Sequence, residues 1–75
     1  MAGLSFSDEY GEMLVLLRGA RKKAGLTQVE VAQSFGVTQG YISKIERGEI
    51  RIDPILLQRF AKLYRVEVTT LLPPD

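Results

Sequence analysis

Residues 25–48 read GLTQVEVAQSFGVTQGYISKIERG, and this stretch predicts two short helices joined by a tight turn. Thr27 can cap the first helix, and Glu30 follows three residues later, which is the spacing of a capping box. Thr38 can cap the second helix, which we expect over residues 39–47. A glycine follows each helix as a stop signal. Each helix therefore begins with the pair Thr-Gln.

A longer helix is predicted before this stretch. Ser7 can cap it, and Gly25 is placed to end it. Apolar side chains recur between them at the spacing of one helix face; they are Tyr10, Met13, Leu14, Leu17, Ala20 and Ala24. Arg21 interrupts this face, so it would be a buried charge without a partner unless an acidic residue pairs with it. Residues 1–6 show no periodicity, and we expect a frayed tail there.

Another helix is predicted after the central stretch. Asp53-Pro54 is a cap residue followed by proline at the first helical position, which is a strong start signal. The apolar stripe that follows consists of Leu57, Phe60, Ala61 and Tyr64. Residues 66–72 predict one more helical turn, and no strand-like alternation extends beyond residues 50–52. The fold class is therefore all-α, with four or five short helices around one core.

Length and composition restrict the possible functions. The chain has 75 residues, 45% of them hydrophobic, which fits a single folded domain. It contains no Cys and no His, so most metal sites and most nucleophile–base pairs are excluded. We expect no metal, no cofactor, no small-molecule ligand and no enzymatic activity. No apolar run is long enough to span a membrane and no signal-peptide pattern opens the chain, so a cytoplasmic location is expected.

The charges are unevenly distributed along the chain. All ten Lys and Arg residues lie between Arg18 and Arg65, whereas residues 1–16 contain acidic side chains and no basic ones. A basic centre between acidic ends favours an anionic partner such as nucleic acid. An ordinary solvated surface is the alternative, because every soluble domain carries charges.

Two short helices joined by a tight turn are typical of a helix-turn-helix, in which the second helix enters the major groove of DNA. The outward face of that helix would carry the residues that read bases; they are Gln39, Ser43 and Lys44. Other side chains and the N–H groups at the helix starts suit the DNA backbone; these side chains are Thr27, Gln28, Thr38, Tyr41 and Arg47. Tyr41 could instead pack under the turn.

The runs LRGARKKAGLTQVEVAQSFGVTQGYISKIERGE and LLQRFAKLYRV resemble the Cro/CI-type (XRE) family of helix-turn-helix transcriptional regulators from bacteria and phages. The resemblance implies a five-helix lambda-repressor-like domain over residues 17–72, with the helix-turn-helix at about 28–47. Residues 1–16 would then be a tail and the start of the first helix, and residues 73–75 a second tail. The most similar members would be small stand-alone ones, such as restriction–modification controller proteins and Cro-like repressors.

The resemblance also assigns roles to individual residues. Gln28 matches a phosphate-facing position, Gln39 the first base-reading position, and Lys44 a position that often contacts a base. Arg21 and Glu46 match a pair that forms an internal salt bridge in several members. The chain departs from the family pattern at Arg65, which replaces a common glycine, and at Glu67, which replaces a common cap residue. We therefore expect the turn after residue 64 to differ and the last helix to be weak.

The family usually binds double-stranded operator DNA as a homodimer, and the sequence offers a candidate dimer surface. The fourth predicted helix and the segment after it carry apolar residues beyond those that one core needs; they are Ile55, Leu56, Leu63, Val68, Leu71 and Leu72. Alternatively, these residues close the core of a monomer. The leading hypothesis is a DNA-binding regulator that recognises a palindromic operator. The other is a protein-interaction module of the same fold, such as an antitoxin or an antagonist of a larger regulator.

Overall fold

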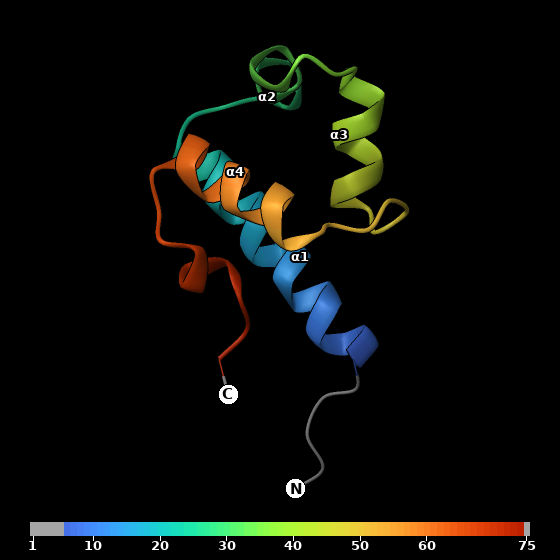
Figure 1. Ribbon diagram of the computed structural model, residues 1–75, viewed down its shortest axis with the longest axis vertical. Coiled ribbons are helices and arrows are strands. Elements are labelled where there is room, and N and C mark those ends of the chain that lie inside the picture. The colour runs from blue at the N-terminus through green and yellow to red at the C-terminus, as the bar shows by residue number, and fades with distance from the viewer. Residues whose placement is uncertain (1–5, 75) are drawn as a thin grey trace, which may run out of the picture.

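The computed structural model describes residues 6–74 and is all-α, with no strand in that part of the chain. Its elements are α1 (Phe6–Lys23), α2 (Gln28–Phe35), α3 (Gln39–Glu46), α4 (Pro54–Tyr64) and a 3₁₀ helix, η1 (Val68–Leu71) (Figure 1). The predicted helical class is confirmed. The count of five helices is not confirmed, because η1 is a single 3₁₀ turn.

The predicted caps of the three shorter α-helices are present. Thr27 Oγ1 accepts a hydrogen bond from Glu30 N over 3.1 Å, and Glu30 Oε1 accepts one from Thr27 N over 2.9 Å, which completes the capping box. Thr38 Oγ1 accepts from the backbone N–H of Tyr41, and Asp53 caps α4 in the same way. These bonds satisfy N–H groups that a helix start leaves without a partner.

The start of α1 was predicted wrongly. The helix begins at Phe6, so Ser7 lies within its first turn and not at its cap. The frayed tail expected over residues 1–6 falls outside the described residues, apart from Phe6. The acidic residues Asp8 and Glu9 occupy the first turn and favour this end of the helix through its dipole.

A residue in the left-handed backbone conformation ends each of the helices α2 and α4. Gly36 has φ 69° after α2, as the stop signal predicted. Arg65 has φ 59° after α4 and donates its N–H to the carbonyls of Ala61 and Lys62. The turn after α4 therefore keeps the left-handed geometry although glycine is missing, and our expectation of a different turn was wrong. Glu67 provides no side-chain cap for η1, which fits the short 3₁₀ turn found there.

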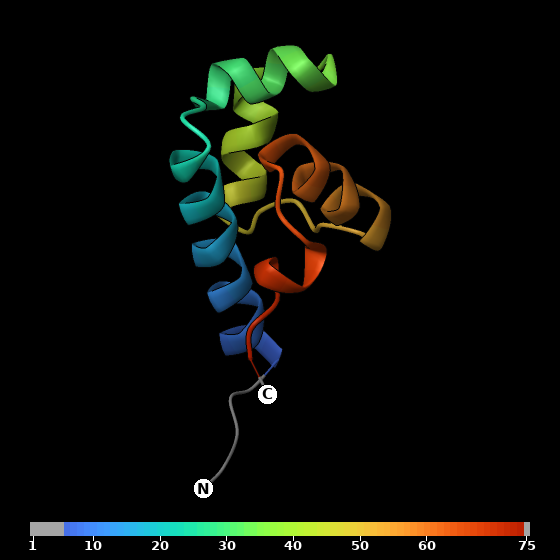
Figure 2. The same cartoon turned by 90° about the vertical axis from the view of Figure 1, so that its left-hand side faces the viewer.

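The helix α1 is the longest element, and most of the other elements pack against it. It contacts α3, α4 and η1, while α2 and α3 pack extensively on each other at one end of the molecule. Figure 2 shows η1 beside α1, below α4, with α2 and α3 at the far end. No helix among residues 6–74 is long and apolar enough to cross a membrane.

The core lies where these helices meet and is built around Phe60. Its ring lies 5.1 Å from the ring of Phe35 and 5.8 Å from that of Tyr64, measured between centroids. The fully buried aliphatic side chains around it come from the four other elements; they are Leu17, Val31, Ile42, Ile45 and Leu71. Leu71 is 1% exposed, so its assignment to the dimer surface was wrong: η1 turns this side chain into the core.

Two contacts of Tyr10 fix the segment between α3 and α4. The hydroxyl of Tyr10 accepts a hydrogen bond from Ile52 N over 2.9 Å, and the guanidinium of Arg51 lies 4.4 Å from the centre of the Tyr10 ring. The first half of α1 therefore holds the linker that follows α3.

Candidate nucleic-acid interface

The structure brings the predicted recognition residues to the outer side of α3. Gln39, Lys44 and Arg47 are exposed, and Ser43 is half-buried. Gln39 begins the helix, Lys44 lies in its last turn and Arg47 is its C-cap. The opposite side of α3 carries Ile42 and Ile45, which are fully buried. The helix therefore has one face that packs into the core and one that is exposed.

The structure also brings together Arg21 and Glu46. Arg21 Nε lies 2.7 Å from Glu46 Oε2 and Arg21 Nη2 lies 3.2 Å from Glu46 Oε1. Their side chains are 11% and 1% exposed. Arg21 Nη1 donates to Leu26 O over 2.9 Å, and Arg18 Nη1 donates to the backbone oxygen of Glu46 over 2.7 Å. Two arginines of α1 thus hold the C-terminal end of α3.

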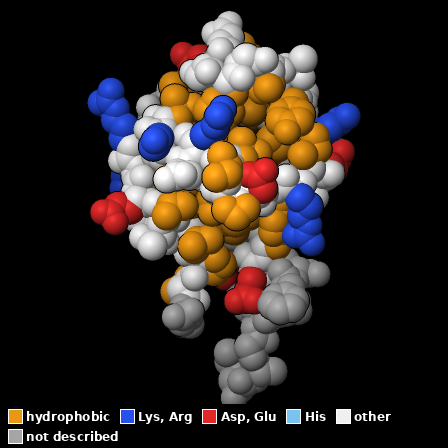
Figure 3. Space-filling model, viewed as in Figure 1, with side chains coloured by type: hydrophobic (Ala, Val, Ile, Leu, Met, Phe, Trp, Pro, Cys, Tyr) orange, Lys and Arg blue, Asp and Glu red, His pale blue; other side chains and the backbone are white. Residues whose placement is uncertain are grey.

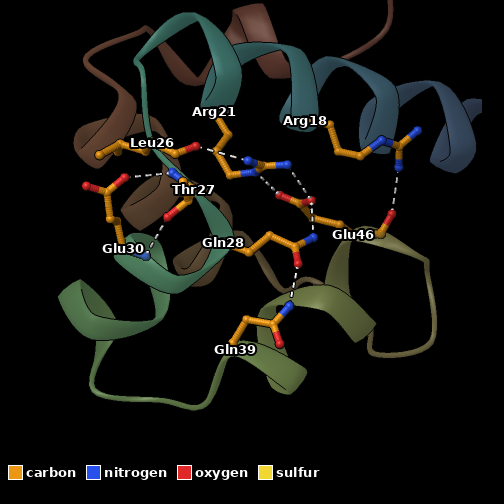
Figure 4. Close-up of polar contacts among 8 residues, drawn as sticks. All are labelled: Arg18, Arg21, Leu26, Thr27, Gln28, Glu30, Gln39 and Glu46. Atoms are coloured by element: carbon orange, nitrogen blue, oxygen red, sulfur yellow. Dashed lines mark hydrogen bonds and ion pairs between the residues drawn. The ribbon is translucent and has the colours of Figure 1, made fainter.

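The two glutamines that begin α2 and α3 are joined to this ion pair. Gln28 Nε2 donates to Glu46 Oε1 over 2.9 Å, and Gln39 Nε2 donates to Gln28 Oε1 over 2.6 Å (Figure 4). Gln28 was predicted to face a phosphate, and it is half-buried here. No local pattern in the sequence indicates these two bonds, because their donors lie eighteen and eleven residues from their acceptors.

A second, exposed cluster surrounds Arg47. Arg47 Nη1 donates to Ser43 Oγ and Arg47 Nε donates to Glu49 Oε2, both over 2.6 Å. The hydrogen bond from Arg47 holds the pKa of the Glu49 carboxyl below its usual value, and the same bond raises the pKa of Arg47. Glu49 is therefore a neighbour of the outer side of α3 that the sequence alone did not reveal. Its nearness to Arg47 reduces the positive charge that Arg47 presents.

The remaining predicted backbone contacts lie at the helix starts. Thr27 and Thr38 are exposed, and each hydroxyl oxygen accepts a cap hydrogen bond, which leaves its O–H able to donate to an external acceptor. Tyr41 is 38% exposed and is not part of the core. Its ring borders a shallow depression of about 230 Å³ between α3 and α4. The alternative in which Tyr41 packs under the turn receives no support from this exposure.

The candidate dimer residues fall into three groups. Ile55, Val68 and Leu72 are 62%, 36% and 43% exposed, and they line one groove of about 470 Å³ between the start of α4 and η1. Leu56 and Leu63 are half-buried, and Leu63 borders a different depression near Arg65. Leu71 is buried, as described above. Figure 3 shows apolar side chains across the middle of the face that carries α4.

One polar group in the core has no partner among the described residues. The hydroxyl of Tyr64 is buried without a hydrogen bond. Burial raises the pKa of this phenol well above its usual value, and the nearby Glu46 carboxylate raises it further. No group of three or more His, Cys, Asp or Glu residues that could hold a metal occurs among residues 6–74.

Comparisons with known proteins agree with this geometry. A family model described as helix-turn-helix matches residues 17–71. A protein of Methanothermobacter thermautotrophicus, named as an uncharacterized HTH-type transcriptional regulator, is 42% identical over 50 residues, which is 67% of this chain and 72% of the relative. No solved structure matches the chain. The match covers most of the chain and includes both helices of the motif, so the chain belongs to the helix-turn-helix family of the XRE type, whose members are DNA-binding transcription regulators and generally not enzymes.

Proposed function

We propose that this protein is a sequence-specific transcription regulator that binds a palindromic operator as a homodimer, with α3 in the major groove. The observation that carries the proposal is the outer face of α3. Its exposed side chains are an amide and two cations, Gln39, Lys44 and Arg47, and no acidic residue lies among them on the helix. An amide can bond both the donor and the acceptor of adenine, and a lysine can reach the acceptors of guanine.

The contacts with the DNA backbone follow from the same orientation. The starts of α2 and α3 present backbone N–H groups and the hydroxyls of Thr27 and Thr38, which suit phosphate oxygens. Gln28, Tyr41 and Arg47 complete the proposed backbone contacts, whereas Ser43 belongs with Gln39 and Lys44 to the proposed base-reading residues. A protein-interaction module of the same fold would need no cationic face on α3, so it is the less favoured function.

The test is selection of bound sequences from a random pool of duplexes, followed by footprinting. We expect one preferred palindrome, and a binding constant that falls steeply with salt because phosphate contacts release counterions. Lys44→Ala should lose about 5- to 150-fold of preference at its base pair if the contact is bidentate. Lys62→Ala is the matched control, because it removes one exposed lysine from α4. Failure of the wild-type chain to bind any duplex would refute the proposal.

We propose the apolar groove beside η1 as the centre of the dimer surface, with Ile55, Val68 and Leu72 as its contacts. The half-buried Leu56 and Leu63 border other depressions and belong to the wider apolar surface of α4. Two domains related by a two-fold axis would place their α3 helices about 34 Å apart, which is one turn of DNA. Sedimentation equilibrium at micromolar concentration tests this. Ile55→Glu should shift the wild-type dimer to a monomer, and Val15→Glu should not, because Val15 is similarly exposed at 57% but lies on α1.

A further inference from the structure

A chain of hydrogen bonds connects the interior of the domain to the proposed recognition face. Glu46 is 1% exposed, Gln28 is half-buried and Gln39 is exposed. The first bond joins Gln28 Nε2 to Glu46 Oε1 over 2.9 Å, and the second joins Gln39 Nε2 to Gln28 Oε1 over 2.6 Å. Figure 4 shows the three side chains in line, from the Arg21 ion pair to the start of α3.

The buried carboxylate of Glu46 determines which group donates and which accepts in each of these hydrogen bonds. Glu46 is ion-paired with Arg21, and an ionised carboxylate accepts hydrogen bonds but donates none. Gln28 must therefore turn its NH₂ group toward Glu46 and its carbonyl oxygen toward Gln39. Gln39 must then turn its own NH₂ group toward Gln28. Reversing Gln39 alone would bring two carbonyl oxygens to the 2.6 Å contact, and reversing both amides would set an oxygen against the carboxylate.

The orientation of Gln39 determines what it can offer to a base. A side-chain amide has two N–H donors and one carbonyl acceptor. After its bond to Gln28, Gln39 keeps one donor and its acceptor for a partner outside the described residues, in a fixed order. Adenine presents an N6–H donor beside the N7 acceptor in the major groove, which is the complement of that order.

We infer that Glu46 is a positioning residue for sequence recognition: acting through Gln28, it fixes the direction of the Gln39 amide and so determines which base Gln39 prefers. The inference rests on the proposed function, because it assumes that α3 reads DNA. It adds a buried, acidic determinant of specificity that contacts no DNA itself.

The first test breaks the chain of hydrogen bonds at Gln28 and leaves the ion pair between Arg21 and Glu46 intact. Gln28→Met removes both amide bonds, and Gln33→Met is the matched control at an exposed position of the same helix. Affinities are measured for the selected duplex and for duplexes changed at the base pair that Gln39 reads. If Gln28 contacted phosphate alone, its loss would weaken all duplexes equally. We expect in addition a loss of preference of about fivefold or more at that base pair, which is the lower end for a bidentate amide contact.

The second test moves the carboxylate from position 46 to position 28 within the chain of hydrogen bonds. Glu46→Gln allows both amides to reverse, and we expect the same loss of preference. The double variant Gln28→Glu with Glu46→Gln places an acceptor-only carboxylate next to Gln39 and near Arg21. This double variant should restore the base preference. The negative charge that it moves to position 28 lies closer to the DNA phosphates, so affinity for every duplex should fall. Glu30→Gln is the control for the change of charge, because glutamine also completes a capping box.

The outcomes separate this inference from the proposed function. A wild-type chain that selects no sequence contradicts the proposed function. A wild-type chain that selects a sequence, together with a Gln28→Met variant that keeps the wild-type preference, overturns the inference. Urea unfolding identifies the folded variants, and the Gln28→Met result stands even if Glu46→Gln unfolds. A purely structural role for Glu46 would change stability without the rescue of base preference by the double variant.

Discussion

Removing one partner of the buried ion pair should destabilise the fold severely. In Arg21→Met the Glu46 carboxylate, 1% exposed, loses two contacts of 2.7 and 3.2 Å, and Leu26 O loses the bond from Arg21 Nη1. Stranding a buried charge in this way costs about 3–5 kcal/mol. A domain of this length has a free energy of unfolding of about 4–11 kcal/mol. The loss therefore brings the variant close to unfolding at room temperature.

A double-mutant cycle measures the coupling between the two residues. Urea unfolding followed by circular dichroism gives the free energy of unfolding of the wild type, Arg21→Met, Glu46→Leu and the double variant. The double variant should lose far less than the sum of the single losses, because a matched apolar pair leaves no charge to solvate. The cycle of Arg47 and Glu49 is the control: that pair is 2.6 Å apart but more than half exposed, so solvent screens it and its coupling should be small. Additive losses for Arg21 and Glu46 would refute this reasoning.

Three further predictions follow from single positions. Tyr64→Phe should raise the free energy of unfolding by about 1 kcal/mol, because it removes a buried hydroxyl without a partner; an unfolding curve unchanged or shifted to lower urea would contradict this. Arg65→Gly should stabilise the domain by up to about 1 kcal/mol, since φ of 59° strains a residue with a Cβ, and thermal unfolding would show it as a higher midpoint. The pKa of Glu49, followed by NMR, should lie below its usual value and rise in Arg47→Gln. Any stabilisation from this pair is present at neutral pH and is lost as pH falls through the lowered pKa of Glu49; a value unchanged by Arg47→Gln would be evidence against the pairing.

The local signals in the sequence predicted most of the helices well. Thr27, Thr38 and Asp53 each cap a helix as expected, because a cap depends on residues three positions apart. The start of α1 was missed because the helix includes Ser7 and begins at Phe6. The turn at Arg65 was missed for a different reason. The backbone bonds to Ala61 and Lys62 hold a left-handed residue there in spite of its side chain.

The candidate site was predictable as a list of residues but not as a network. The spacing of residues 25–48 places Gln39, Lys44 and Arg47 on the outward face of one helix. It cannot show that Gln28 bonds Glu46, because that contact depends on how α2 packs against α3. The burial of Leu71 likewise depends on the 3₁₀ turn of η1, whose geometry turns this side chain toward α1 and α4.

The bond between Tyr10 and Ile52 bears on where the folding unit begins. The family model starts at residue 17, yet Tyr10, Met13 and Leu14 lie before it and pack against the same core. A segment trimmed to residues 17–71 would keep every proposed recognition residue. It would lose the hydroxyl that accepts from Ile52 N and two buried side chains under the linker. The shared family segment is thus shorter than the part of the chain that builds the core, because the first half of α1 contributes side chains to it.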